Sequence, residues 1–142
     1  MTKLDELCGR LSKQYLEPSA AALPQETIVE SIRLSLERIN VWFSERFEIQ
    51  GLDGSTIDTL PEDFVPCLLT GAGANLTRFM LQAHLSSYTN MGGEPELMRY
   101  LSAYLEERFV WMLEGLRLDS LQKSVDIPFA PWKWEEKLTW RT

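Results

Sequence analysis

The side chains able to do chemistry in this chain of 142 residues are few and do not cluster. The single histidine, His84, has no cysteine, aspartate or second histidine near it in the sequence, whereas a zinc site needs several nitrogen or sulfur ligands. Ser86 and Ser87 follow it without the pattern of a nucleophile elbow. We therefore expect His84 to be a packed or hydrogen-bonded helix residue rather than a ligand or general base.

Paired acids and closely spaced glycines give no catalytic signature either. Glu106-Glu107 and Glu135-Glu136 are adjacent pairs, so on a helix the members of each pair point apart and act as solvated charges. Gly71 and Gly73 precede no lysine and follow no strand pattern, which argues against a phosphate loop and for close packing. We expect no enzymatic activity, no metal and no cofactor.

Composition and charge narrow the class of protein. Apolar residues make up 44% and charged residues 25%, an ordinary globular balance for one domain with one core. The net charge of -7 and the lack of a basic block argue against DNA or RNA binding as the main activity. Cys8 and Cys67 form no Cys-x-x-Cys motif, which predicts reduced thiols in a cytosolic fold. The N-terminus has no apolar signal core, so we expect a soluble protein used without secretion.

The elements that position any functional surface are organised around a segment of low charge. Residues 64–93 contain one formally charged residue, Arg78, and are interrupted too often by polar residues to span a membrane. A helix over residues 64–91, capped by Asp63, is predicted to form the centre of a small all-α antiparallel bundle. Its four consecutive small residues predict the close approach of another backbone: Gly71, Ala72, Gly73 and Ala74.

Two long amphipathic helices and one short helix are predicted around this centre. Apolar residues at intervals of three and four predict a helix from Pro24 to Phe47: Ile28, Ile32, Leu36, Ile39, Phe43 and Phe47. A last helix, from Pro95 to about Lys123, carries one apolar stripe: Leu97, Leu101, Tyr104, Leu105, Phe109, Met112, Leu113 and Leu116. A capping box of Thr2 and Asp5 opens a short helix that ends at Leu16, and this first piece is either mobile or docks only in an assembly.

Three residues are candidates for a contact between subunits. Trp42 lies at the edge of its stripe and belongs either to the core or to a contact with a neighbouring subunit. Val110 and Trp111 lie off the stripe of the last helix, so this helix is predicted to be apolar on a second face.

An acidic loop or small hairpin, residues 48–60, separates the first long helix from the central one. Residues 48–63 hold no base and these acids: Glu48, Asp53, Asp58, Glu62 and Asp63. We interpret this segment either as a solvated loop or as a surface that repels DNA or meets a basic partner.

The last segment is predicted to be an extended tail, because Pro128 and Pro131 are incompatible with a helix. Its aromatic residues either fold back on the bundle or dock to another chain, and the candidates for docking are Ile127, Phe129, Trp132, Trp134 and Trp140. The predicted organisation is thus a short helix and linker (1–22), a bundle core (23–124) and a docking tail (125–142).

This order of elements resembles the head-to-tail connector proteins of tailed bacteriophages, also called adaptor or head-completion proteins. The resemblance covers residues 23–118 and rests on Val65-Pro66-Cys67-Leu68-Leu69-Thr70-Gly71-Ala72-Gly73-Ala74, on the following Leu76-Thr77-Arg78-Phe79, and on residues 100–116. It implies a structural virion protein that forms a homo-oligomeric ring, usually a dodecamer, beneath the portal protein. Such a ring assembles in the host cytoplasm and lies at the head–tail interface.

The resemblance also implies roles for the surfaces described above. The ring extends the channel through which DNA passes without specific binding, and it offers a platform to tail or nozzle proteins, with no membrane involved. Residues 127–140 would grip the portal or a neighbouring subunit. Glu48, Asp53 and Asp58 would face the channel and repel DNA. The alternative is a cytosolic helical adaptor or chaperone that binds a protein partner through its tail.

Overall fold

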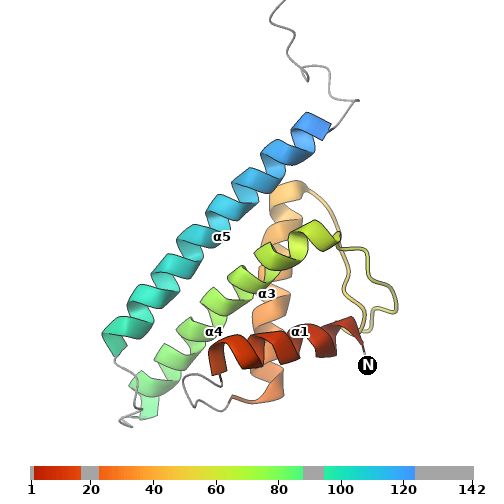
Figure 1. Ribbon diagram of the computed structural model, residues 1–142. Coiled ribbons are helices and arrows are strands. Elements are labelled where there is room, and N and C mark those ends of the chain that lie inside the picture. The colour runs from red at the N-terminus through yellow and green to blue at the C-terminus, as the bar shows by residue number, and fades with distance from the viewer. Residues whose placement is uncertain (1, 17–22, 88–94, 124–142) are drawn as a thin grey trace, which may run out of the picture.

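The computed structural model describes residues 2–16, 23–87 and 95–123, and these residues form a small helical bundle (Figure 1). Its α-helices are α1 (Lys3–Leu11), α3 (Gln25–Phe43), α4 (Val65–Ser87) and α5 (Pro95–Lys123). A π-helical turn, η1 (Ser12–Leu16), follows α1, and a 3-10 turn, η2 (Glu62–Phe64), leads into α4. No strand occurs in the described ranges, so the predicted all-α bundle is confirmed and residues 48–60 form a loop rather than a hairpin.

The helix of low charge lies at the centre of the bundle. α4 packs against both α3 and α5 and runs antiparallel to α5, while α1 lies across α3 and α4 (Figure 1). Burying charge is costly, so the helix with the most neighbours is the one that carries the fewest charges.

Small residues on α4 and α3 let these two helices approach closely, as predicted. Ser31 and Ser35 of α3 are fully buried against α4. The hydroxyl of Ser35 donates to the carbonyl of Leu68 at 2.8 Å, and the amide of Asn75 donates to the carbonyl of Ser31 at 3.0 Å. These contacts satisfy buried polar groups, which would otherwise destabilise the core.

The N-terminal helix is part of this core. Its predicted capping box forms: the Asp5 backbone N–H donates to the Thr2 hydroxyl at 3.2 Å, and the Thr2 N–H donates to the Asp5 carboxylate at 3.1 Å. Hydrogen bonds from the backbone and side chain of Thr2 lower the pKa of the Asp5 carboxyl. Leu4, Leu7 and Leu11 are buried. The expectation of a mobile piece, or of one that docks only in an assembly, is therefore wrong for residues 2–16.

The predicted helix from Pro24 to Phe47 ends earlier, at Phe43. Ser44 adopts a left-handed conformation with φ 54°, which ends α3. The side chain of Asn40 then binds both backbone groups of Phe47, accepting from its N–H at 2.9 Å and donating to its carbonyl at 3.3 Å. Phe43 and Phe47 still contact the ring of Phe64, with ring centroids 4.9 and 5.4 Å from it.

The start of α4 also differs from the prediction. Asp63 lies inside η2 and is not an N-cap, and α4 begins at Val65. Pro66 is the second residue of α4, where the missing backbone N–H would have no partner within the helix. Residues 88–91 of the predicted helix lie outside the described residues.

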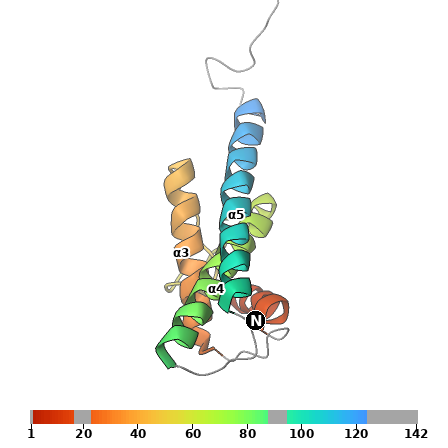
Figure 2. The same ribbon diagram turned by 90° about the vertical axis from the view of Figure 1, so that its left-hand side faces the viewer.

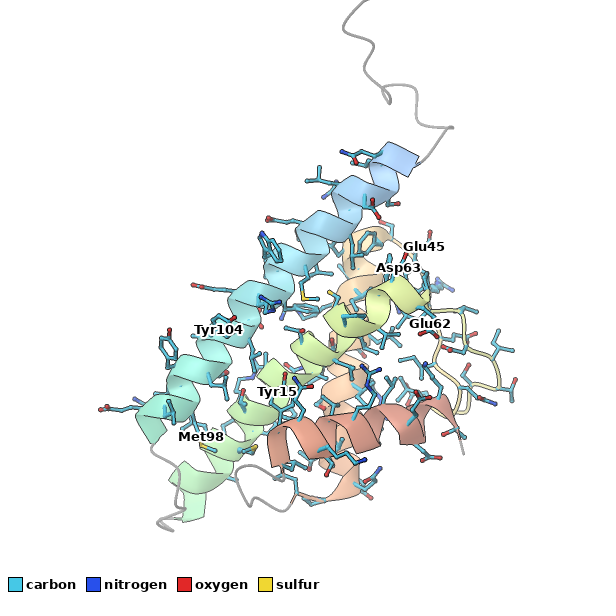
Figure 3. The ribbon with its side chains drawn as sticks, viewed as in Figure 1. Tyr15, Glu45, Glu62, Asp63, Met98 and Tyr104 are labelled. Atoms are coloured by element: carbon cyan, nitrogen blue, oxygen red, sulfur yellow. The ribbon has the colours of Figure 1, made fainter. Side chains whose placement is uncertain are left out.

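α5 has the predicted bounds, but its side facing the core is narrower than the predicted stripe. Leu105, Phe109 and Leu113 are buried, and three partly buried residues pack against the core: Met98, Met112 and Leu116. The other members of the predicted stripe are exposed: Leu97, Leu101 and Tyr104. Figure 3 shows Met98 toward α4 and Tyr104 on the side of α5 turned away from α4.

Candidate interaction surface

Metal-ligating side chains do not gather in the part of the chain that the structure describes. The described residues contain no group of three or more His, Cys, Asp or Glu side chains placed to hold a metal ion. No described helix is long and apolar enough to cross a membrane. His84 lies in α4, with its side chain outside the described part of the chain.

Cys8 and Cys67 are free thiols buried in the core. Burial raises the pKa of both, and for Cys67 it raises the pKa to about 12. The sulfur of Cys67 lies 4.0 Å from the carbonyl oxygen of Phe109, at the contact between α4 and α5. Because the thiolate is the reactive form, neither cysteine is poised as a nucleophile.

We expect both cysteines to resist a thiol reagent in the folded protein at pH 8 and to react rapidly after denaturation. Rapid labelling of the folded wild type at pH 8 would contradict this prediction.

The pKa of Cys67 is higher in the folded chain than its ordinary value of 9.0. Its contribution to stability is therefore fully present below pH 9 and is lost as the pH rises toward 12. Urea unfolding at several pH values should show this loss in the wild type and a smaller one in Cys67→Ala. An equal loss in the two proteins would contradict this second prediction.

A row of exposed apolar side chains lies on α5, on the side opposite the core. We call it the α5 outer face, and it consists of Leu97 (63% exposed), Tyr100 (72%), Tyr104 (48%), Trp111 (67%) and Leu118 (60%). Successive residues turn about 100° around a helix. Tyr100 and Leu118 each lie nine residues from buried Phe109. Nine residues make about two and a half turns of a helix, so both side chains lie on the side of α5 opposite Phe109. Figure 2 turns this side toward the viewer, and no described helix covers it.

A second apolar surface lies where α3 and α5 meet. A groove of about 350 Å³ is lined by Glu37, Arg38, Val41, Trp42, Val110 and Leu113. Val41 is 81% exposed and Trp42 is 37% exposed, with the Arg117 guanidinium 5.8 Å from the centroid of the Trp42 ring. Trp42 is thus a partly exposed residue at the junction of α3 and α5. It lies outside the core, and the Arg117 guanidinium covers part of its ring.

The structure brings two of the three predicted contact residues together and separates the third. Trp42 and Val110 line the same groove, whereas Trp111 lies on the α5 outer face. α5 does have a second apolar side, but of the two residues predicted to form it only Trp111 belongs to it. Sequence reasoning missed Tyr100 and Leu118, and it placed Leu97 and Tyr104 on the core side. The seven-residue spacing of Leu97, Tyr104, Trp111 and Leu118 was the signal that could have found this face.

The acidic loop packs on the bundle instead of projecting freely from it. Ile49, Leu52 and Leu60 are buried, and the backbone N–H of Glu48 donates to the Thr59 hydroxyl at 2.7 Å. Gly51 adopts a φ of 94° beside Thr2, where any side chain would collide with the start of α1.

Basic residues from other elements neutralise part of the charge of this segment. Arg33 of α3 pairs with Asp53 at 2.8 Å, and Lys3 of α1 pairs with Glu62 at 3.3 Å. These bridges are partly exposed, so each contributes little to stability, but they lower the local negative charge. The three acids predicted to face the channel all have exposed side chains: Glu48, Asp53 and Asp58. Asp53 is the one of them that pairs with Arg33.

The five candidate docking residues of the tail lie outside the described residues: Ile127, Phe129, Trp132, Trp134 and Trp140. Comparison with known protein families, with curated proteins and with solved structures finds no match to this chain. The interpretation of the surfaces therefore rests on their own geometry.

Proposed function

We propose that this chain is a structural assembly protein that works through contacts with other proteins. The observation that carries the proposal is the α5 outer face, a row of exposed leucine, tyrosine and tryptophan side chains on a helix already packed by its other side. Large exposed apolar surfaces mark interaction sites, and buried tryptophan and tyrosine anchors contribute most to interface affinity.

The finer proposal is that the chain forms a ring beneath the portal of a tailed bacteriophage. A closed ring of identical subunits needs two different surfaces that fit each other. The α5 outer face and the groove at Trp42 and Val110 lie on different sides of α5 and are the candidates for these two surfaces. Glu48 and Asp58, which are exposed on the loop, are the candidates for repelling DNA in the channel.

The test is to look for a portal gene beside the gene of this chain, to mix the purified chain with that portal protein and to measure particle mass and shape. Rings of many copies attached to the portal are expected. A truncation that ends at Ser124 should keep the bundle folded, as measured by circular dichroism, and lose portal binding. Matched variants that change Ile127 and Phe129, or Trp132 and Trp134, to alanine separate the two halves of the tail.

Two results would overturn the ring, and a third would overturn the docking tail. A chain that stays a monomer or dimer in the presence of the portal is not a connector. Capture of some other protein through the tail, without ring formation, would favour a cytosolic adaptor or chaperone. Unfolding of the truncated chain would show that residues 125–142 belong to the core rather than to a docking surface.

A further inference from the structure

The exposed residues of α5 follow the seven-residue repeat of a helix that pairs with another helix. One row recurs every seven positions at Leu97, Tyr104, Trp111 and Leu118. A second row follows three positions later at Tyr100, Glu107, Glu114 and Leu121. All eight side chains are exposed. Two rows with this spacing form the seam of a coiled coil, in which the residues of each row insert between those of the partner helix.

The two ends of this seam are apolar and its middle carries charge. Leu97 and Tyr100 lie at the start, Leu118 and Leu121 lie at the end, and Glu107 and Glu114 lie between them. This distribution decides which way a partner helix of the same sequence can run. In a parallel pair each residue of the seam meets its own copy, so Glu107 would face Glu107 and Glu114 would face Glu114. Like charges in a partly buried seam are destabilising.

An antiparallel pair of the same helix removes this conflict. Residues of one row then face residues of the other row, and the register that uses all eight positions pairs residues whose numbers add to 218. At the ends, leucine and tyrosine meet leucine, as Leu97 meets Leu121 and Tyr100 meets Leu118. In the middle, Tyr104 faces Glu114 and Trp111 faces Glu107. The tyrosine hydroxyl and the indole N–H are donors, and a carboxylate is an acceptor, so each acid meets a donor of the second copy.

From this complementarity we infer that two copies of the free chain pair through their α5 outer faces, with the two α5 helices antiparallel. The contact is isologous, because the row that begins at Leu97 meets the row that begins at Tyr100 of the second copy, and the reverse contact is identical. The bundles lie on opposite sides of the pair, since α4 packs on the far side of α5. The seam from Leu97 to Leu121 has 24 residue steps, about 36 Å of helix.

This inference goes beyond the proposed ring and does not rest on it. The pair covers the apolar face of α5 when no other protein is present. A portal or neighbouring subunit that uses the same face must displace the second copy. The test uses the purified chain alone, so the pair and the ring can fail separately.

Sedimentation velocity of the full chain over a range of concentrations measures the pairing. A dimer is expected for the wild type. Trp111→Glu should weaken it at least about 30-fold, because a central tryptophan is lost twice and a carboxylate is placed opposite Glu107. The matched control is Ile57→Glu, which puts the same charge on an exposed apolar residue of the loop and should leave the dimer unchanged. A monomeric wild type, or a dimer that Trp111→Glu leaves intact, would refute the pairing.

Oxidative cross-linking tests the antiparallel register. The double variant Leu97→Cys/Leu121→Cys should form an intermolecular disulfide, whereas each single variant should not, since its two copies of the cysteine lie about 36 Å apart in the pair. The wild type is the control, and it should form no intermolecular disulfide because its own cysteines, Cys8 and Cys67, are buried. Cross-linking of the single variants would indicate parallel helices and would overturn the proposed register. Failure of the double variant to cross-link would do so as well.

Discussion

Phe109→Ala is expected to lower the free energy of unfolding by about 3–5 kcal/mol, the typical effect of removing a fully buried aromatic ring. Phe109 is the largest side chain with no solvent exposure among the residues that the structure describes. Its ring lies against Gly71 of α4, and the guanidinium of Arg38 from α3 is 4.7 Å from its centroid. One ring therefore joins the three long helices, and alanine would leave a cavity among them. Because small domains are stable by only about 5–15 kcal/mol, this loss is a large share of the total.

Urea denaturation followed by far-ultraviolet circular dichroism measures this effect through the midpoint and slope of the transition. Arg108→Ala is the matched control, because it truncates a long exposed side chain next to Phe109 in the same helix. We expect a change within about 0.5 kcal/mol for that variant. A loss below about 1 kcal/mol for Phe109→Ala would mean that the ring does not hold α3, α4 and α5 together.

The sequence predicts the central helix well because the physical cause is local and strong. A helix with neighbours on most sides cannot hold charges without partners, so the low charge of residues 64–93 marked α4 as the centre. The capping box at Thr2 was found for a similar reason, since all of its atoms belong to four consecutive residues.

The side of α5 that faces the core could not be chosen from the sequence. Leucine and aromatic residues lie on two opposite sides of this helix, so steps of three and four connect them into one broad stripe. The choice is made by the partners: small Gly71 on α4 leaves room for the ring of Phe109, and no described helix covers Tyr104. Such pairing depends on residues far apart in the chain.

The net charge of the loop surface could not be read from the sequence for a related reason. Within residues 48–63 the acids have no basic neighbour in the sequence. Arg33 and Lys3 reach this segment from α3 and α1, at separations of 20 and 59 residues. Counting charges along the sequence does not detect such bridges. The structure therefore weakens Asp53 as a candidate for repelling DNA and leaves Glu48 and Asp58 in that role.

Gly71→Ala is expected to destabilise the chain by about 1–3 kcal/mol, the range for overpacked cores, although alanine normally stabilises a helix relative to glycine by about 1 kcal/mol. An added Cβ would lie 2.4 Å from the Ser35 hydroxyl oxygen and 2.6 Å from the Phe109 ring. The Ser35 hydroxyl is held by its hydrogen bond to Leu68, and the Phe109 ring is enclosed, so neither group can move without loss.

A matched control and a double variant make the sign of this effect informative. Gly9 is an exposed residue inside α1 with nothing within 4 Å of an added Cβ, so Gly9→Ala should stabilise the chain by up to about 1 kcal/mol. Phe109→Leu shortens the side chain that meets Gly71. The double variant Gly71→Ala/Phe109→Leu should therefore lose less unfolding free energy than the sum of the losses of the two single variants. Strict additivity, or a stabilising Gly71→Ala, would show that α4 and α5 are not in close contact there. In that case the side of α5 assigned to the core, and with it the outer face, would have to be reassigned.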